Sequence, residues 1–312
     1  MLPSSFFDVV RPTTILESPR LSRRLGARVI LATETFQHTG SFKFRAAYNV
    51  AKEVSQKLLI AASSGNFGQA LACACSLLGK RSMVVMPDTS AAVKIDAVRE
   101  YGGQVELVDV RAKSRAARVA ELAADHPEAY LASAYDDPLV IEGNSTLGLE
   151  LGLCDNTKTR FDFVVAPVGG GGLTSGIIQG LRLIGSAAPV IGAEPLLAND
   201  AARSLQAGHI VANESEPQTI ADGARTLSLG RHNWEILKDG LARIIEVPEE
   251  NIAEAVRLLF TLANLKAEPT GALSLAAVLT APDAFRHRTI CCVISGGNVD
   301  PEVYRRILIA DC

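Results

Sequence analysis

Short apolar runs alternate along the chain with longer amphipathic stretches. The runs are typical of buried strands, and they occupy residues 28–32, 57–62, 81–86, 105–108, 163–166, 190–193 and 289–294. Alanine-rich or amphipathic segments between them predict helices, for example at residues 69–78, 115–125 and 173–183. Strands that alternate with helices in this way predict an α/β fold, in which helices cover mostly parallel sheets.

Composition narrows the class of protein. The 312 residues are 48% hydrophobic and 21% charged with a net charge of −3, which predicts a globular chain with a large core or two domains. The sequence has no basic patch that would suggest a nucleic-acid partner, and no apolar run is long enough to span a bilayer. The first residues lack a charged segment followed by an apolar stretch, so we expect a cytoplasmic protein without a membrane partner. The cysteines and histidines lack zinc-ligand spacing.

One lysine and a run of four glycines suggest the chemistry. The amine of Lys43 can form an imine with an aldehyde, and the run Gly169, Gly170, Gly171 and Gly172 follows 126 residues later between a predicted strand and a predicted helix. Free N–H groups and the positive end of the helix dipole favour a phosphate at such a place. A surface lysine and an ordinary turn are the simpler alternatives. Together the two features suggest pyridoxal phosphate.

Two more polar loops follow predicted strands. The first is Ser63-Ser64-Gly65-Asn66-Phe67-Gly68, in which backbone N–H groups and hydroxyls could receive a carboxylate. Either serine could instead be a simple helix N-cap. The second is Ser295-Gly296-Gly297-Asn298, after the last predicted strand. Since ligands gather at the carboxyl ends of parallel strands, the three loops predict one shared site.

Six blocks along the chain together resemble the fold-type-II pyridoxal-phosphate enzymes, in the branch of threonine and serine dehydratases and serine racemases. They are Thr39-Gly40-Ser41-Phe42-Lys43, Ser63-Ser64-Gly65-Asn66, Gly169 to Gly172, Thr219-Ile220-Ala221-Asp222-Gly223, Glu268-Pro269-Thr270-Gly271-Ala272 and Ser295-Gly296-Gly297-Asn298-Val299-Asp300. The resemblance implies two open, mostly parallel twisted sheets flanked by helices, as in the β subunit of tryptophan synthase. It also implies a large cofactor-binding domain (residues 1–48 and 144–312), a small mobile domain (residues 49–143) and a homodimer.

The resemblance implies a role for each matching residue. Lys43 becomes the Schiff-base lysine and catalytic base, and Ser64 the second acid/base that racemases use. The cofactor contacts would come from Phe42, Lys43, Asn66, Gly169, Gly170, Gly171, Gly172, Leu173 and Ser295. The amino-acid substrate would be bound by Ser63, Ser64, Gly65, Asn66, Phe67 and Gly223. Asn66 would contact the ring hydroxyl of the cofactor, and Ser295 would face its pyridine nitrogen.

A further block resembles the cation site of serine racemase. The carboxylates of Glu194 and Asp200 and the carbonyl of Ala198 would hold a divalent ion. Oxygen ligands suit Mg²⁺ or Ca²⁺ better than zinc. A solvated acidic loop is the equally weighted alternative.

The chain departs from the family pattern at several positions. Phe67 stands where histidine is usual, which suggests a shifted substrate preference, such as a bulkier or more apolar 3-hydroxy amino acid. Residues 133–138 and 143–146 differ from the family's His-Pro and Gly-Gln-Gly-Thr patterns. The second region resembles one that borders the nucleotide site in animal serine racemase, so control by ATP is not expected. An acidic 3-hydroxy amino acid could be served by an arginine such as Arg225.

These features predict α,β-elimination from L-threonine or L-serine, which yields a 2-oxo acid and ammonia. A serine opposite the ring nitrogen carries no negative charge to keep that nitrogen protonated, so expulsion of a β-hydroxyl is favoured over a long-lived carbanion. Racemisation of serine or a related amino acid, with Ser64 as the second proton donor, is the alternative within the same site. A ligand-binding protein on a degenerate enzyme fold is the alternative from another class.

Overall fold

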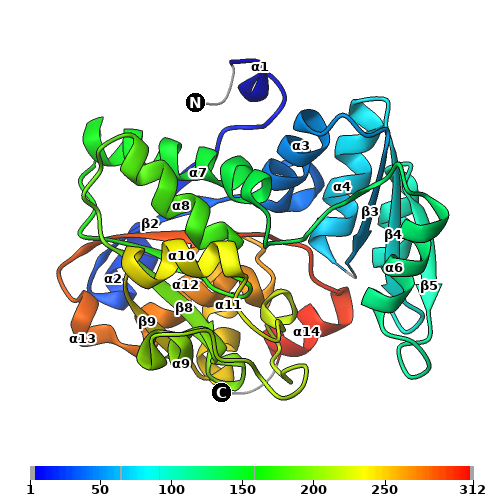
Figure 1. The fold of residues 1–312 in the computed structure, drawn as a ribbon. Helices are drawn as coiled ribbons and strands as arrows, with labels where there is room; N and C mark the ends of the chain where they lie inside the picture. The colour runs from blue at the N-terminus through cyan, green and yellow to red at the C-terminus, as the bar shows by residue number, and fades with distance from the viewer. Residues whose placement is uncertain (1–3, 64, 91, 158, 310–312) are drawn as a thin grey trace.

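The strands form two separate sheets. The computed structural model describes residues 4–63, 65–90, 92–157 and 159–309. The six-stranded sheet has the order β1-β2-β10-β7-β8-β9 and comprises β1 (Thr14–Glu17), β2 (Arg28–Thr33), β7 (Phe163–Pro167), β8 (Val190–Pro195), β9 (Leu241–Val247) and β10 (Thr289–Ile294). The four-stranded sheet has the order β5-β4-β3-β6 and comprises β3 (Leu58–Ala62), β4 (Arg81–Pro87), β5 (Gln104–Val108) and β6 (Tyr130–Leu131). The smaller sheet lies on the right in Figure 1.

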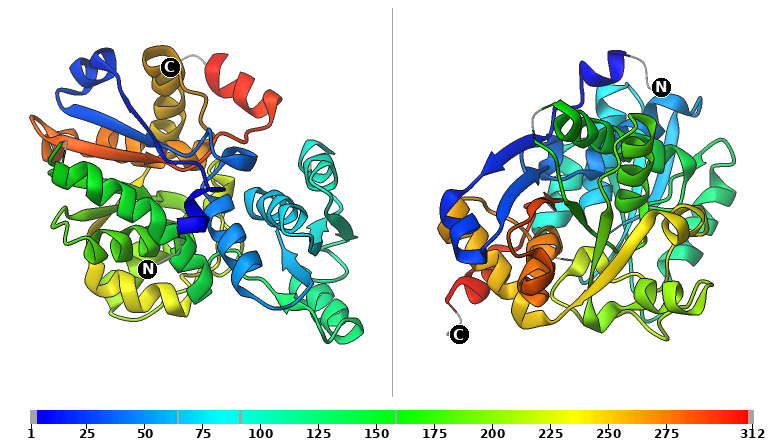
Figure 2. Two further views of the ribbon diagram at one scale, coloured as in Figure 1. Left: turned by 90° about the horizontal axis from the view of Figure 1, so that it is seen from above. Right: turned by 90° about the vertical axis from the view of Figure 1, so that its left-hand side faces the viewer.

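Helices surround both sheets, as the views in Figure 2 show. In the first half of the chain they are α1 (Ser4–Phe7), α2 (Pro19–Leu25), η1 (His38–Gly40), α3 (Lys43–Glu53), α4 (Asn66–Leu77), α5 (Ala92–Glu100), α6 (Arg115–Asp125) and α7 (Pro138–Thr157). In the second half they are α8 (Gly172–Leu183), η2 (Leu196–Ala198), α9 (Asp200–Ala207), η3 (Asp222–Ala224), α10 (Arg231–Gly240), α11 (Glu249–Ala263), α12 (Pro269–Thr280), α13 (Pro282–Phe285) and α14 (Pro301–Ile309). The predicted α/β architecture with two helix-flanked sheets is confirmed.

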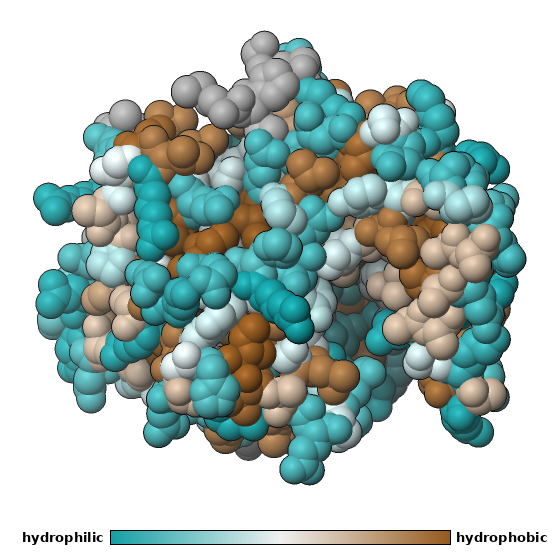
Figure 3. All heavy atoms as spheres, in the orientation of Figure 1, coloured by the Kyte–Doolittle hydropathy of each residue, from teal (hydrophilic) through white to brown (hydrophobic). Residues whose placement is uncertain are grey.

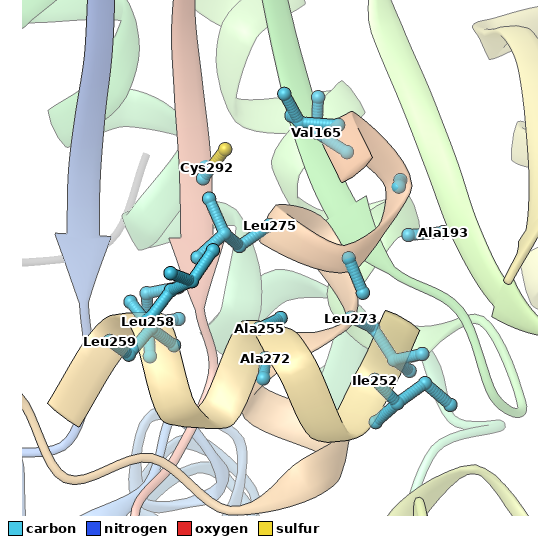
Figure 4. Close-up of a cluster of buried hydrophobic side chains, with 14 of the residues drawn as sticks. Val165, Ala193, Ile252, Ala255, Leu258, Leu259, Ala272, Leu273, Leu275 and Cys292 are labelled. Atoms are coloured by element: carbon cyan, nitrogen blue, oxygen red, sulfur yellow. The ribbon is translucent and has the colours of Figure 1, made fainter. Parts of the chain in front are cut away.

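The strand pairs are parallel except β1 with β2, which is antiparallel. Because successive side chains of a strand point to opposite faces, the larger sheet has a core on each side. In β7, Val165 faces α11 and α12, whereas Val164 and Ala166 belong to the core that α7 and α8 cover. Figure 4 shows the first of these cores, where Leu275 of α12 points toward Cys292 of β10 and Leu258 lies beside Leu259 on α11.

Glycines let α7 and α8 approach each other backbone to backbone. A Cβ atom placed on Gly180 would overlap the carbonyl oxygen of Ser145, and one placed on Gly148 would overlap that of Ile177. Such a contact leaves no room for side chains, since protein interiors are already close-packed. The contact fixes α8, and α8 begins at the glycine run after β7.

The four-stranded sheet is formed within residues 58–131, inside the range assigned above to the small domain. The limits at residues 48/49 and 143/144, and the mobility of this domain, stay predictions. Across the described ranges, no helix has both the length and the apolar character that a membrane crossing demands.

Candidate active site

A cavity of about 740 Å³ opens where β3, β7 and β10 end. Figure 3 shows the corresponding hollow between the larger body and the smaller lobe on its right. Residues predicted to bind cofactor or substrate line it, namely Phe42, Lys43, Ser63, Gly65, Asn66, Phe67, Gly169, Gly170, Gly171, Gly172, Leu173, Gly223 and Ser295. Ser64 lies outside the described residues. The fold therefore brings the three predicted loops together, although they are far apart in sequence.

Lys43 is the first residue of α3 and points its amine into the cavity. Its Nζ donates a hydrogen bond to the carbonyl oxygen of Ala134 at 2.6 Å, and it lies 5.0 Å from the ring centroid of Phe42 and 5.8 Å from that of Phe67. Burial lowers the pKa of Lys43 to about 8, and the charge of Glu268 opposes this shift. The amine is thus closer to a neutral base than an exposed lysine is.

The backbone before Lys43 is held in an unusual conformation. Thr39 has φ 60° and Gly40 has φ 72°, both in the left-handed region. For a β-branched residue such as Thr39 this conformation is a genuine outlier, of the kind found at functional sites. A Cβ on Gly40 would lie 2.5 Å from Oδ1 of Asn298, so the loop after β10 packs directly against this turn. A single antiparallel bridge between Ser41 and Gly296 fastens the two loops beside the lysine.

The glycine run, called the glycine cradle below, is packed so closely against its neighbours that side chains would overlap them. Gly171, with φ 95°, is the N-cap of α8, a twelve-residue helix. A Cβ on Gly170 would overlap the ring of Tyr135, and one on Gly172 would lie 2.7 Å from the carbonyl oxygen of Tyr135. The run thus has to be glycine because Tyr135 packs against it, and the glycines also line the cavity, where the free N–H groups at the start of α8 favour a phosphate. An amine at one side of the cavity and this cradle at another fit pyridoxal phosphate, which has an aldehyde and a phosphate.

Tyr135 and Asn233 belong to the cradle, although neither was singled out as a site residue. The side-chain amide of Asn233, which is fully buried, donates to the carbonyl oxygens of Gly170 at 2.7 Å and Tyr135 at 3.0 Å. It therefore ties the glycine run to the loop at residues 133–137. The unusual composition of that loop was the one signal in the sequence, and nothing marked Asn233.

Glu268 is the other functional candidate that residue-by-residue reasoning missed. Only 4% of it is exposed, and its Oε1 accepts a hydrogen bond from Nδ2 of Asn66 at 2.7 Å inside the cavity. Burial, followed by the charge of Asp222, raises the pKa of Glu268 to about 8, and the Asn66 hydrogen bond opposes the rise. Its place in the Glu268-Pro269-Thr270 block was the available signal.

Charged side chains also line the cavity. Lys94 of α5 forms an ion pair with Asp222 of η3 at 2.7 Å, and Arg115 of α6 lies 4.0 Å from Glu216. The two pairs connect helices of the smaller lobe to loops of the larger one. Arg225, considered above for an acidic substrate, directs its guanidinium to the carbonyl oxygen of Thr219, with Nε at 2.8 Å.

The predicted cation ligands lie together, outside the residues that line the cavity. Both oxygens of Glu194 accept backbone N–H groups, from Ala201 at 2.8 Å and Ala202 at 2.9 Å. Asp200 is buried, and its Oδ2 has no hydrogen-bond partner among the described residues. Burial raises the pKa of Asp200 to about 6. No cluster of three or more His, Cys, Asp or Glu able to hold a metal occurs in the described ranges, so a cation would need a backbone ligand such as Ala198.

Comparisons with known proteins agree with this geometry. A model of the family described as "Pyridoxal-phosphate dependent enzyme" matches residues 6–296. The chain is 35% identical over 319 residues to the L-threo-3-hydroxyaspartate ammonia-lyase of Pseudomonas sp, with 98% of each covered. It is 34% identical to the serine racemase of Mus musculus, with 94% of this chain and 88% of the relative covered.

The crystal structure of the T.th. threonine deaminase matches with a TM-score of 0.89. Its identity to this chain is 41%, and the match covers 95% of this chain and 97% of that one. The family supports pyridoxal phosphate as the cofactor, and the ammonia-lyases among the relatives support an enzyme of that type. With an amine, a glycine cradle and polar loops meeting in one cavity, the chain belongs to the pyridoxal-phosphate dependent enzyme family.

Proposed function

We propose that this enzyme converts L-threonine or L-serine to a 2-oxo acid and ammonia by α,β-elimination. The observation that carries the proposal is the meeting of Lys43, the glycine cradle and Ser295 in one cavity. Pyridoxal phosphate, when bound, supplies an aldehyde and a conjugated ring that takes up electrons released at Cα of the substrate. The protein supplies the base, the binding contacts and the electrostatics.

Lys43 is the base that removes the Cα proton. With a pKa of about 8, roughly one amine in ten is uncharged at pH 7, against fewer than about one in a thousand for an ordinary lysine. Burial of the amine is what lowers this pKa, and the rings of Phe42 and Phe67 lie beside the amine. The proton gained from Cα can pass to the departing β-hydroxyl, which leaves as water. The released enamine then hydrolyses to a 2-oxo acid and ammonia.

Ser295 favours elimination over other outcomes. Its side chain is buried in the wall of the cavity, where the family resemblance assigns it to the pyridine nitrogen. A neutral hydroxyl cannot balance a positive charge on that nitrogen as a carboxylate would. Negative charge on the ring is therefore stabilised less, and loss of the β-hydroxyl becomes the easier path.

The start of α4 is suited to the substrate carboxylate. Gly65 is the N-cap of this twelve-residue helix, and Asn66 is its first residue. Oγ of Ser63 accepts the N–H of Gly68 at 3.1 Å, which shapes the loop around the helix end. Free N–H groups at a helix N-terminus favour an anion. We assign the α-carboxylate to this loop and retain Ser64 and Gly223 as proposed substrate contacts.

A 3-hydroxyaspartate is the second candidate substrate. Arg115 is a cation on the cavity wall whose approach to Glu216, at 4.0 Å, is long for an ion pair. Its guanidinium could therefore form a bidentate pair with the second carboxylate of such a substrate. The name of the Pseudomonas relative favours the same class. Phe67, an apolar wall, instead supports a substrate with an apolar β-substituent.

The pure holoenzyme should be assayed with L-serine, L-threonine and L-threo-3-hydroxyaspartate for 2-oxo acid and ammonia. We expect stoichiometric release of both products from L-threonine and L-serine. If 3-hydroxyaspartate is the better substrate, Arg115→Ala should lower its kcat/KM about 30-fold, since a charge pair formed on binding contributes about 2 kcal/mol or more. The same variant should leave L-serine nearly unaffected. No ammonia from any of the three amino acids contradicts the proposed function.

Racemisation and elimination are distinguished by their products. The similarity to mouse serine racemase favours it as the rival reaction. D-serine and pyruvate should be followed together from L-serine, and D-serine as the main product would reverse the ranking. Ser64→Ala, at a position outside the described residues, should keep deamination and remove any racemisation.

A divalent cation at Glu194, Ala198 and Asp200 is proposed as a structural partner of the enzyme. The unpartnered Oδ2 of buried Asp200 supports it, because a buried carboxylate oxygen without a partner is costly. Mg²⁺ or Ca²⁺ should raise the melting temperature of the chelator-treated protein by several degrees. Asp200→Asn should remove this response, whereas a wild-type protein that ignores both ions contradicts the site.

Three organisational predictions accompany this function. The family resemblance implies a homodimer and a mobile small domain at residues 49–143, and the N-terminal sequence suggests a cytoplasmic enzyme. Sedimentation of the purified protein would test the first of these.

A further inference from the structure

Three side chains form a hydrogen-bonded chain along the wall of the cavity. Nδ2 of Asn298 donates to the carbonyl oxygen of Thr39 at 2.6 Å and to Oδ1 of Asn66 at 2.8 Å. Nδ2 of Asn66 in turn donates to Oε1 of Glu268 at 2.7 Å. Asn66, Asn298 and Glu268 all line the cavity, so the chain lies beside the space assigned to the cofactor.

The backbone carbonyl of Thr39 determines which atoms donate and which accept along this series of hydrogen bonds. A carbonyl oxygen can only accept, so the atom of Asn298 beside it must be the amide nitrogen. The same nitrogen faces Asn66, which must therefore present its own oxygen to Asn298. The nitrogen of Asn66 is left on the opposite side, toward Glu268.

Glu268 is the last acceptor in this series of hydrogen bonds, at the end opposite Thr39. Its backbone N–H donates to the carbonyl oxygen of Gly296 at 3.1 Å, and a Cβ on Gly296 would overlap its Oε1. The carboxyl group is thus wedged between the loop after β10 and Asn66. An unprotonated carboxyl oxygen is present in both the charged and the neutral form of Glu268, and either form can accept the Asn66 N–H.

We propose that Asn298 and Glu268 are positioning residues that hold the Asn66 amide so that an N–H, and not the carbonyl oxygen, faces the ring oxygen of the cofactor. The inference rests on the proposed function in taking pyridoxal phosphate as the bound group, and on the family resemblance in placing Asn66 at its ring oxygen. An amide nitrogen carries two hydrogens: one goes to Glu268 and the other is available to the cavity. If the Asn66 amide were reversed, its nitrogen would face the side-chain nitrogen of Asn298 and its oxygen would face the carboxyl oxygen of Glu268.

The consequence concerns the charge state of the bound cofactor. A hydrogen-bond donor stabilises an anionic ring oxygen, whereas a carbonyl oxygen in the same place would repel it. The lysine-bound cofactor absorbs in the visible when the ring oxygen is anionic and in the near ultraviolet when it is neutral. The ratio of these two bands therefore reports the orientation of the Asn66 amide without any substrate.

The test compares absorbance spectra and cofactor dissociation constants of holoenzyme variants. Asn298→Asp has nearly the same shape but cannot donate to Thr39 or Asn66, so it favours the reversed amide. We expect the visible-to-near-ultraviolet ratio to fall about tenfold and the dissociation constant to rise about tenfold, as expected for one charge-assisted hydrogen bond. Asn66→Ala should produce a change of similar size. Glu268→Gln should change the ratio less than about threefold, because its amide oxygen can still accept.

Asn298→Ala removes the donor without forcing the reversal, and it should lower the ratio by about threefold or more. It keeps the test decisive if the aspartate variant does not fold. Asn156→Ala is the matched control, since Asn156 also donates to a backbone carbonyl, of Ile184 at 3.3 Å, but on the exposed surface. Spectra and dissociation constants of both Asn298 variants that match wild type overturn the inference. Absence of deamination in an enzyme whose spectra change as expected would instead count only against the proposed function.

Discussion

Lys43→Ala should lose the visible absorbance of the cofactor and at least about 1,000-fold of the deamination rate. Two effects combine, because the variant lacks both the covalent attachment point and the base, and a positioned base alone contributes about 100- to 10,000-fold. Borohydride reduction followed by peptide mass spectrometry should find the cofactor on Lys43 in wild type and on no peptide of the variant. Stability should change little, since the amine is held by a hydrogen bond to a single carbonyl, that of Ala134, within the described part of the chain.

Lys57→Ala is the control for this experiment. Lys57 is exposed beside β3 and does not line the cavity, so its variant should keep both absorbance and activity. If the reduced cofactor were found on any lysine other than Lys43, the assignment of the catalytic amine would be wrong.

Arg45→Ala should lower the free energy of unfolding by about 3–5 kcal/mol, the usual cost of breaking a buried ion pair by removing one partner. Arg45 has no exposed surface, and Glu34 is only 1% exposed. The guanidinium binds Glu34 at 2.7 Å and Glu150 at 2.8 Å, and it donates to the hydroxyls of Thr13 and Thr146. Without it, the Glu34 carboxylate stays buried without a countercharge. Urea unfolding of the purified protein measures the loss.

The control is an arginine–glutamate pair of the same chemistry at the surface. Arg28 contacts Glu17 at 2.9 Å, but the two side chains are 50% and 44% exposed. Water and salt screen such a pair, so Arg28→Ala should cost less than about 1 kcal/mol. Equal losses from the two variants would show that burial does not set the strength of the Arg45 network.

The seven strands expected from apolar runs are all present, and the three further strands found among the described residues share one property. β1, β6 and β9 each lie at the edge of a sheet. An edge strand is covered less, so its side chains need not form the continuous apolar run that identifies an interior strand. In β1, for instance, Ile15 is exposed between partly buried neighbours. Edge position depends on how the strands assemble, which no local pattern records.

In the candidate site, too, some residues could be predicted from the sequence and others could not. Motifs whose residues are consecutive in the sequence, such as the glycine run and the Phe42-Lys43 pair, could be recognised from the chemistry of those residues. Asn233 could not be found in this way, because its importance comes from two carbonyl groups on different loops. Glu268 stood in a recognised block, yet its role depends on Asn66, which is 202 residues away in the chain. Arg225, considered for a substrate carboxylate, lines the cavity, and Nε and Nη2 of its guanidinium donate to the carbonyl oxygen of Thr219, a contact that the sequence does not reveal.

The residues Gly169 to Gly172 themselves contribute only main chain to the cradle, so none of these four has a side chain whose removal could inactivate it. Damage must come instead from added atoms, since a single methyl group on Gly170 would occupy the place of the Tyr135 ring. The tolerance of this segment to mutation is therefore one-sided: every substitution enlarges a residue, and none can make it smaller.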